Sequence, residues 1–412
     1  MSMNQDVTLD SLTELRNVQR ANVYKQGIHV ATLTRTDDGI KFEYLHSWIR
    51  EGGASVASTL PVSNIPIIRP GGALPSFFSG LLPEGRRLGV LVRQVKTSAD
   101  DELSLLLVIG ADVIGDVQIL PEGGDPSKVP QHLQVNDFAE MRFDQLLIDL
   151  GIRAERVGIP GVQDKISTAL LNLPVSHRGS RFILKLNPLE FPFVVENEEF
   201  FLRAAKLSGL SVASAELVTD KEGVHGLLVK RFDRIPSGEN VEPKMLAMED
   251  ASQSLGKPPA DKYLISSEEA FKSLTTLCLA PKPAAQIFIS QLVFAYLTGN
   301  GDAHAKNFSV MQLQTGEWVP TPAYDLPSTY FYGDFTMAMT ISGRNSNNIR
   351  GIEFVELGKH LGLPERAVRR VITEQCNHMD TWLPLVTALP FDPAKIAKLQ
   401  KFAQYRRDRL QH

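Results

Sequence analysis

Residues suited to chemistry gather in the segment Gly299 to Phe308, which reads GNGDAHAKNF. Asp302 and Asn307 stand five positions apart in it, and Asp325 follows in the sequence PAYDLPS. Phosphoryl transfer uses such a set, because one carboxylate accepts the proton of the acceptor hydroxyl while an amide oxygen and a second carboxylate bind Mg²⁺. The plainer alternative makes residues 300–302 a turn and Asp302 a helix cap. The segment alone leaves both interpretations open.

A lysine in an apolar strand is a second candidate. Lys185 lies within RFILKL, which alternates as a strand does. Its ammonium must be paired or face an anion, because burying a bare charge is costly, and a kinase places such a lysine on the α and β phosphates. The next predicted helix offers Glu196, Glu198 and Glu199 as partners. The alternative is an edge-strand lysine whose ammonium reaches water.

Two backbone segments complete this set. Residues 158–161 (GIPG), with 162–165 after them, predict a strand, turn and strand whose glycines let backbone approach phosphates. They are not a Walker A loop, because the chain has no Gly-Lys-Ser/Thr. Residues 226–234 (GLLVKRFDR) end the strand-rich part, where the backbone of a hinge can bind adenine. All these features occur in the order that kinases have them.

The elements that must position these residues follow from hydrophobic periodicity. After a connector at residues 120–131, the pattern predicts sheet with one helix and then a helical half. Strands are predicted at 22–34 with a turn at Gln26-Gly27, and at 40–45, 165–173, 180–186, 215–219 and 226–232. Helices are predicted at 11–20 with Asp10 as cap, at 74–95 with a Pro-Glu-Gly break, and at 143–150, 196–210, 267–277, 284–297, 352–361, 365–377 and 393–410. Residues 120–131, rich in Gly, Pro and charge, predict a connector between two units.

Composition excludes several classes of protein. The 412 residues carry a net charge of −4, so the chain as a whole does not attract nucleic acid or anionic membranes. The basic run at 406–409 (RRDR) is better explained as a solvated helix end than as a nucleic-acid patch. No stretch approaches the length of a membrane span, and the start lacks a signal peptide, so we expect a cytoplasmic protein without membrane contact. The two cysteines, Cys278 and Cys376, are expected to be plain thiols.

Seven short motifs together resemble the HipA-type serine/threonine kinase toxins of bacterial toxin-antitoxin pairs. The resemblance runs from about Val23 to the C-terminal helices. It rests on FFSGLLPEGRR (77–87), GVQDK (161–165), FILKL (182–186), Asn197-Glu198, VKRFDR (229–234), DAHAKNFS (302–309) and Tyr324-Asp325. The implied fold is α+β, a protein-kinase-like two-lobed fold with an additional N-terminal β-rich subdomain and a helical C-lobe. The implied division is an extension at 1–20, the N-terminal subdomain at 21–122, the kinase N-lobe at 137–232 and the C-lobe at 233–412.

The resemblance also implies roles for single residues. Asp302 is the catalytic base, Lys185 holds the phosphates, and Asn307 and Asp325 bind Mg²⁺. The remaining contacts to ATP are implied for the phosphate loop, the hinge and the catalytic segment: Pro160, Gly161, Val162, Gln163, Asp164, Lys165, Lys230, Arg231, Phe232, His304, Ala305, Lys306 and Tyr324. Family members phosphorylate translation components, commonly aminoacyl-tRNA synthetases. A small helix-turn-helix antitoxin, HipB-like, neutralises them and binds DNA, so the kinase meets DNA only indirectly.

This sequence departs from the family at one regulatory position. Well-known members begin the phosphate loop with a serine that is autophosphorylated, which ejects the loop; here Gly158 stands there. Residues 1–20 also have no counterpart that we can place. Two other functions remain as alternatives: a non-catalytic nucleotide-binding partner with the same fold, and a metal-dependent phosphoesterase using Asp302, His304 and Asp325. The phosphoesterase needs more metal ligands than the sequence readily offers.

Overall fold

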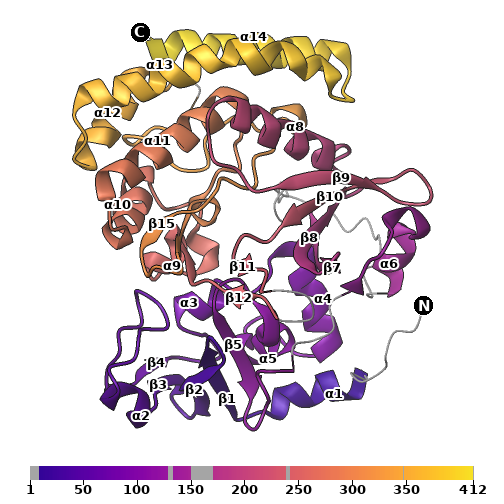
Figure 1. The fold of residues 1–412 in the computed structure, drawn as a ribbon, viewed down its shortest axis with the longest axis vertical. Helices are drawn as coiled ribbons and strands as arrows, with labels where there is room; N and C mark the ends of the chain where they lie inside the picture. Colours follow the sequence, from indigo (N-terminus) through magenta and orange to yellow (C-terminus); the bar gives the residue numbers. More distant parts are fainter. Residues whose placement is uncertain (1–8, 129–132, 150–169, 238–241, 347, 412) are drawn as a thin grey trace.

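The computed structural model describes residues 9–128, 133–149, 170–237, 242–346 and 348–411. It has an N-terminal unit (residues 9–128) at one end, a small lobe built on a second sheet in the middle, and a large helical lobe at the other end (Figure 1). The expected α+β fold with two lobes and an added N-terminal β-rich part is confirmed.

An antiparallel sheet of five strands forms the N-terminal unit, in the order β4-β3-β2-β1-β5. The predicted turn at Gln26 and Gly27 joins its first two strands, and both residues have positive φ (50° and 78°), as a tight hairpin needs. Apolar side chains on one face of the sheet build a core of their own. The strands are β1 (Arg20–Lys25), β2 (Ile28–Thr36), β3 (Gly39–Tyr44), β4 (Ile67–Arg69) and β5 (Val117–Pro121).

Helices cover this sheet and reach toward the lobes (Figure 1). They are α1 (Leu9–Glu14), α2 (His46–Arg50), α3 (Ser76–Ser79), α4 (Gly85–Val95) and α5 (Glu102–Ile109). The prediction for the first helix was wrong in part: Asp10 lies inside α1, of which the structure describes Leu9–Glu14, and Arg20 belongs to β1. The expected break between α3 and α4 falls at residues 80–84, and α4 starts at Gly85 with φ +55°.

The small lobe contains the second sheet, in the order β6-β7-β8-β10-β9. Its strands are β6 (Leu133–Gln134), β7 (Leu171–His177), β8 (Ser180–Leu186), β9 (Ala215–Thr219) and β10 (His225–Lys230). The helices α6 (Phe143–Asp149) and α8 (Val194–Leu207) belong to it. The strand predicted at 165–173 enters β7 only from Leu171, and residues 165–169 lie outside the described part. Val90 of α4 packs into the core of this lobe, so the N-terminal unit is joined to it by apolar contact.

The large lobe is built around α11, whose side chains are buried on nearly every face. Its helices are α9 (Ala251–Ser254), α10 (Ser267–Leu277), α11 (Pro281–Thr298), α12 (Gly351–His360), α13 (Glu365–Trp382) and α14 (Pro393–Gln411). Short strands lie between the lobes: β11 (Arg234–Ile235) with β12 (Lys244–Met245), and β13 (Met248–Asp250) with β14 (Ser309–Gln312) and β15 (Trp318–Pro320). All five helices predicted in this half are present: α10 has the predicted bounds, and the ends of the other four are shifted by at most five residues.

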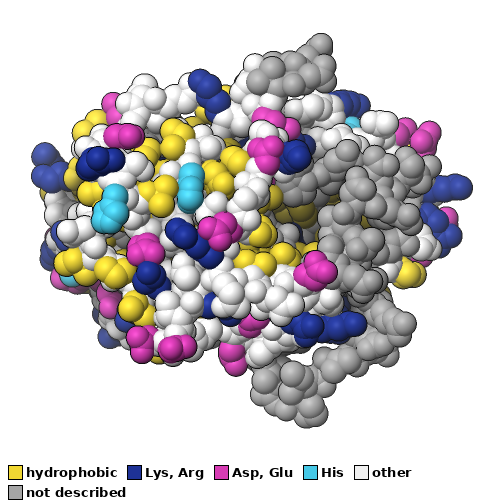
Figure 2. Space-filling model, turned by 90° about the horizontal axis from the view of Figure 1, so that it is seen from below, with side chains coloured by type: hydrophobic (Ala, Val, Ile, Leu, Met, Phe, Trp, Pro, Cys, Tyr) yellow, Lys and Arg dark blue, Asp and Glu magenta, His cyan; other side chains and the backbone are white. Residues whose placement is uncertain are grey.

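The described surface carries mixed charges, and the two cysteines are free thiols. On the described surface in Figure 2, Lys and Arg side chains are interspersed with Asp and Glu and form no continuous basic patch. Among the described helices none is both long and apolar enough to cross a bilayer. Cys278 and Cys376 are buried free thiols, and burial raises the pKa of each to about 11.

Candidate active site

The loop after α11 holds Asp302 in a fixed backbone conformation. Gly299 ends the helix with φ +69°, a left-handed conformation that glycine adopts without strain. The side chain of Asn300 then accepts from the Asp302 N–H at 3.0 Å, and the Asn307 side chain donates to the Asp302 carbonyl at 2.9 Å. Asp302 itself is 3% exposed. Two amide side chains of the loop therefore fix the backbone on both sides of the predicted base.

Tyr263 binds the carboxylate of Asp302 directly. Its hydroxyl donates to Asp302 Oδ1 at 2.8 Å, and its ring packs edge-on against His304 with 5.1 Å between centroids. Tyr263 lies just after a 3₁₀ turn at Pro259–Asp261, far from the loop in sequence. The orientation of the predicted base thus depends on a second segment of the large lobe.

Lys185 meets two carboxylates between the lobes. Its ammonium lies 2.7 and 3.0 Å from the two oxygens of Glu198 on α8, and it also bonds to Asp325. Burial alone would lower the pKa of Lys185, but Asp325 and Glu198 raise it above its usual value. Of the three candidate glutamates the structure selects Glu198.

The two carboxylates around Lys185 differ in their electrostatics. Burial and the neighbouring charge of Asp325 raise the pKa of Glu198 although Lys185 opposes the shift. Burial would also raise the pKa of Asp325, but Lys185 outweighs it and the pKa is lowered. Asp325 has φ +52°, a left-handed conformation that Asp tolerates better than most residues. Asp325 is therefore the ionised group held toward the loop, where its carbonyl accepts from Asn300 at 3.3 Å.

His304 is buried as a neutral imidazole. Burial, helped by the nearby charge of Lys262, lowers its pKa to about 3. Neither of its ring nitrogens has a hydrogen-bond partner among the described residues. A buried polar group of this kind commonly faces a bound molecule or water.

Tyr324, which precedes Asp325, contacts the loop that contains Asn307. Its hydroxyl donates to the carbonyl of Lys306 at 2.8 Å, and its ring lies 5.8 Å from that of Phe232 in the hinge. Asn307, Tyr324 and Asp325 line one small cavity. The structure therefore brings predicted residues of the loop and of the segment at 324–325 to the same place.

The hinge is partly committed to other contacts. The Lys230 N–H donates to Ser214 and the Arg231 N–H donates to Arg181, so these two groups are already engaged. The Arg231 guanidinium is buried and binds Asp233 and also Asp112 of the N-terminal unit. Phe232 is the hinge residue whose ring lies toward Tyr324.

Arg231 belongs to a buried charge cluster at the hinge. Arg234 binds the same two carboxylates, Asp112 and Asp233, so two guanidinium groups and two carboxylates compensate one another. Both arginines also donate to the carbonyl of Val113. The cluster joins the N-terminal unit to the hinge.

The predicted phosphate loop, Pro160 to Lys165 with Gly158, lies outside the described residues. The structure brings together, around the loop at 299–308, these of the predicted nucleotide contacts: Lys185, His304, Ala305, Lys306, Asn307, Tyr324 and Asp325. No group of three or more His, Cys, Asp or Glu side chains in the described ranges could hold a metal ion. Asp325 and Asn307 offer one ionised carboxylate and one amide, which fits Mg²⁺, since this ion takes few protein ligands and several from phosphates and water.

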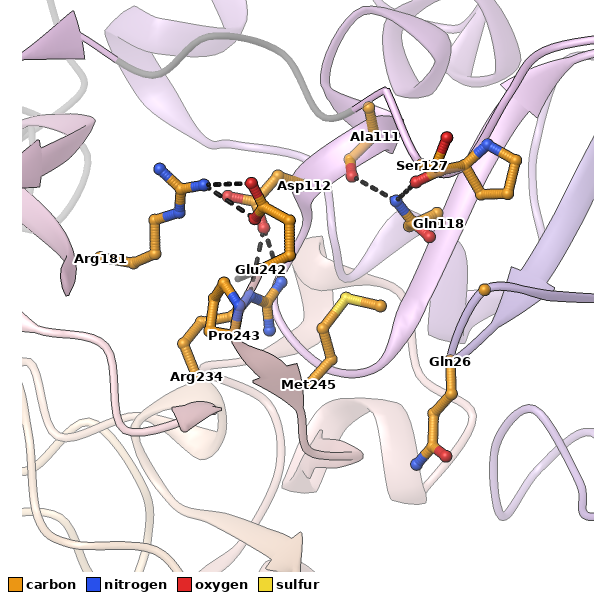
Figure 3. Close-up of a pocket in the computed structure, with 12 residues that line it drawn as sticks. Gln26, Ala111, Asp112, Gln118, Ser127, Arg181, Arg234, Glu242, Pro243 and Met245 are labelled. Atoms are coloured by element: carbon orange, nitrogen blue, oxygen red, sulfur yellow. Dashed lines mark hydrogen bonds and ion pairs between the residues drawn. The ribbon is translucent and has the colours of Figure 1, made fainter. Parts of the chain in front are cut away.

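A larger cavity of about 260 Å³ lies elsewhere, between the N-terminal unit, Arg181 of the small lobe and the segment of β11 and β12 (Figure 3). Its charged side chains are already paired, Arg181 with Glu242 and Arg234 with Asp112. Gln118 donates to the carbonyls of Ala111 and Pro126. None of the predicted site residues lines this cavity, so it is separate from the catalytic loop.

Sequence reasoning missed three residues around the loop. Glu84 of the N-terminal unit forms ion pairs with Lys262 and Lys306, and Tyr263 binds Asp302. Glu84 lies inside the motif FFSGLLPEGRR, which carried the family resemblance without a role. The motif was therefore a sequence signal that could have pointed to Glu84. No motif in the sequence points to Lys262 or Tyr263.

Comparison with known proteins places the chain in a family. Residues 21–120 match the model of the HipA N-terminal domain, and residues 157–383 match the HipA-like C-terminal domain. A Sinorhizobium fredii protein, Y4mE, whose name assigns it provisionally to the kinases, is 32% identical over 79% of this chain and 82% of the relative. The Shewanella oneidensis serine/threonine-protein kinase toxin HipA is 27% identical over 80% of each chain.

The fold agrees with these matches. A solved complex of HipA, HipB and operator DNA from the Shewanella oneidensis toxin-antitoxin system contains a chain that superposes with a TM-score of 0.78 at 22% identity, over 95% of this chain and 97% of that one. The N-terminal unit and both lobes are thus shared in fold. From the two domain models, the curated relatives and this fold together, we conclude that the chain belongs to the HipA family of kinases.

Proposed function

We propose that the chain is an ATP-dependent serine/threonine-protein kinase that acts as the toxin of a bacterial toxin-antitoxin module. The contact of Lys185 with Glu198 and Asp325, beside the loop of Asp302 and Asn307, carries this proposal. This contact brings together a lysine on a strand, a glutamate on a helix and an aspartate that can bind a metal ion, as phosphoryl transfer needs. The alternative, a non-catalytic nucleotide-binding protein with the same fold, would bind ATP without transferring its γ phosphate.

Each residue has a separate role in this proposal. Asp302 accepts the proton of the serine or threonine hydroxyl, and the Tyr263 hydroxyl keeps its carboxylate oriented. Lys185 binds the α and β phosphates of ATP, and Glu198 holds the lysine in place. Asp325 and Asn307 hold Mg²⁺, which when bound neutralises charge on the phosphates. His304, Tyr324 and Phe232 line the nucleotide, and Pro160 to Lys165 cover its phosphates.

The partners in this proposal follow from the relatives. We assign a HipB-like helix-turn-helix antitoxin, because the superposing Shewanella chain comes from a complex with HipB and operator DNA. The chain then meets DNA only indirectly, through the antitoxin, in agreement with its net charge of −4. The substrate is a component of translation, such as an aminoacyl-tRNA synthetase, in the cytoplasm. The proposed domains are an N-terminal extension at 1–20, the N-terminal subdomain at 21–122, the kinase N-lobe at 137–232 and the C-lobe at 233–412.

The test uses purified protein and ATP labelled on its γ phosphate. The parent chain should transfer label to a protein acceptor, with aminoacyl-tRNA synthetases tried first, rather than release free phosphate. Asp302→Asn should abolish transfer and keep ATP binding, because the base acts on the acceptor proton while other groups hold the nucleotide. Asp380→Asn, at an exposed ion pair with Arg407, is the matched control and should remain active.

Growth on overexpression tests the toxin role. Arrest by the parent and not by Asp302→Asn is the expected result. Arrest that survives Asp302→Asn would contradict a toxin acting through its kinase activity, and free phosphate without protein labelling would favour a phosphoesterase.

A further inference from the structure

A carboxylate of the N-terminal unit lies beside the catalytic loop. Glu84, at the break before α4, bonds to the ammonium of Lys262 and lies 3.5 Å from that of Lys306. Burial alone would raise the pKa of Glu84, but the two lysines outweigh it and the pKa is lowered. Glu84 is therefore ionised and serves as counter-charge to two cations of the large lobe.

Both lysines depend on this carboxylate because they are largely buried. The side chains of Lys262 and Lys306 are 5% and 14% exposed. Lys306 also donates to the carbonyl of Gly80 at 2.8 Å and lies 3.7 Å from Asp250. Its ammonium is thus held by two groups of the N-terminal unit and one carboxylate of the large lobe. A buried ammonium that loses its partner is costly, so these contacts fix where the lysine lies.

The same contacts continue to the predicted base. Lys306 precedes Asn307, whose side chain binds the backbone of Asp302. The carbonyl of Lys262 accepts from the Ala305 N–H at 3.3 Å, and the next residue, Tyr263, bonds to Asp302. The Lys262 ammonium lies 5.1 Å from the centre of the Tyr263 ring. Glu84 thus bears on the loop from two sides, through Lys306 and through the segment 262–263.

We propose that Glu84 is a positioning residue for phosphoryl transfer, so that the N-terminal unit forms part of the active site. This inference rests on the proposed kinase function. Glu84 sets the geometry of Asp302 through Lys262 and Lys306, while the proposed ATP contacts Lys185 and Phe232 belong to the small lobe and the hinge. Loss of the charge should therefore lower kcat and leave the KM for ATP nearly unchanged.

The first experiment compares Glu84→Gln with Ser76→Ala in the full chain. Ser76 is the matched control, because its hydroxyl bonds to the Gly256 carbonyl across the same interface but outside the lysine contacts. We expect Glu84→Gln to lower kcat roughly tenfold or more, since misplacement of reacting groups by about 1 Å costs up to 10²-fold. The KM for ATP should change less than about twofold in both variants. Equal kcat values for the two variants, or a loss that lies in KM alone, would overturn the inference.

Hydrogen exchange gives a measurement that needs no activity. The amides of Ala305 and Asn307 donate to Lys262 and His304 within the loop, so their exchange reports its order. Glu84→Gln should speed exchange there, and Ser76→Ala should not. Unchanged exchange in Glu84→Gln refutes the positioning role. A parent chain that labels no protein refutes the kinase proposal itself, so the two failures are distinguishable.

Tyr263→Phe tests the same route with a second variant, in case Glu84→Gln does not fold. It removes only the hydroxyl that binds Asp302 and lies wholly in the large lobe. It should reproduce the loss of kcat at constant KM for ATP, and in combination with Glu84→Gln the losses should be less than additive. Full activity of Tyr263→Phe, or additive losses, would show that Glu84 does not act through this route.

Discussion

The ammonium of Lys185 lies between the carboxylates of Glu198 and Asp325, one on a helix of the small lobe and one on a loop of the large lobe. One cation thus bridges the two lobes where ATP is proposed to bind. Glu196 and Glu199, the other candidates, are occupied elsewhere: Glu196 with His225, and Glu199 with Arg203 on its own helix.

Lys185 and Glu198 should behave as one unit in a double-mutant cycle. Lys185→Ala should lower transfer by misplacing the phosphates, and Glu198→Ala should reproduce part of that loss, because each change disables the same contact. We expect a coupling of about 0.5–3 kcal/mol from steady-state kinetics. Glu199→Ala is the control, since its exposed partner Arg203 lies one turn away. Fully additive losses would show that Glu198 does not act together with Lys185 and is only an acidic residue near the start of its helix.

Asp325→Asn should weaken ATP binding only when Mg²⁺ is present. The ionised carboxylate is the proposed metal ligand, and losing a charged contact costs about 1.5–3 kcal/mol, roughly tenfold or more in affinity. Calorimetry with and without Mg²⁺ measures the effect, with the exposed Asp408→Asn as control. If parent and variant respond to Mg²⁺ alike, Asp325 is not a metal ligand.

His304 should make stability depend on pH. Burial lowers its pKa from 6.5 to about 3, so the folded chain keeps it neutral while the unfolded chain protonates it below about pH 6.5. Its contribution to stability is present above pH 6.5 and is lost as the pH falls toward 3. Between pH 7.5 and 5.5, the parent should lose about 1 kcal/mol more free energy of unfolding than His304→Asn.

Urea denaturation at the two pH values measures this difference. His360→Asn, at an exposed histidine on α12, should lose as much as the parent. Equal losses in the parent and in His304→Asn would mean that the imidazole is not held neutral by burial.

Autophosphorylation should not silence this kinase at the start of its phosphate loop. Gly158 has no hydroxyl, and residues 158–165 contain no Ser, Thr or Tyr. Activity should therefore persist on long incubation with ATP, and intact-mass spectrometry should find no stoichiometric phosphate on this loop. Asp302→Asn serves as the blank for phosphate added by the enzyme itself. Stoichiometric phosphate on Ser167 or Thr168 with parallel loss of activity would show that the regulatory site has moved.

The sequence was most informative where local signals agree. The helix predicted at 267–277 has the bounds of α10, because Ser266 and Glu269 form a capping box just before an apolar run. The strand lysine could be picked out since a cation within an apolar strand needs an anion. Choosing Glu198 over its neighbours was not possible, because that depends on how α8 is rotated against β8.

The contacts around Asp302 could not be predicted from local patterns. Glu84 and Lys262 are 178 positions apart, and Tyr263 and Asp302 are 39 apart. The Glu84–Lys262 pair forms only because the N-terminal unit and the large lobe pack together, and the Tyr263–Asp302 pair forms only because two distant segments of the large lobe do. No periodicity in the sequence encodes either packing. The hydrogen bonds from the Lys230 and Arg231 amides to the carbonyls of Ser214 and Arg181 were also hidden, because they depend on how the strands of the small lobe pair.

The charge cluster at the hinge limits which N-terminal units can be combined with which lobes in a chimera of two relatives. Asp112 comes from the N-terminal unit, while Arg231, Asp233 and Arg234 come from the segment that follows the small lobe. A chimera that joins the N-terminal unit of one relative to the lobes of another takes one member of this cluster from one parent and three from the other. Unless the donor supplies a carboxylate at the place of Asp112, two buried guanidinium groups share a single counter-charge, a defect worth about 3–5 kcal/mol. Exchange of the two parts between genes is therefore constrained at the hinge as well as at the catalytic loop.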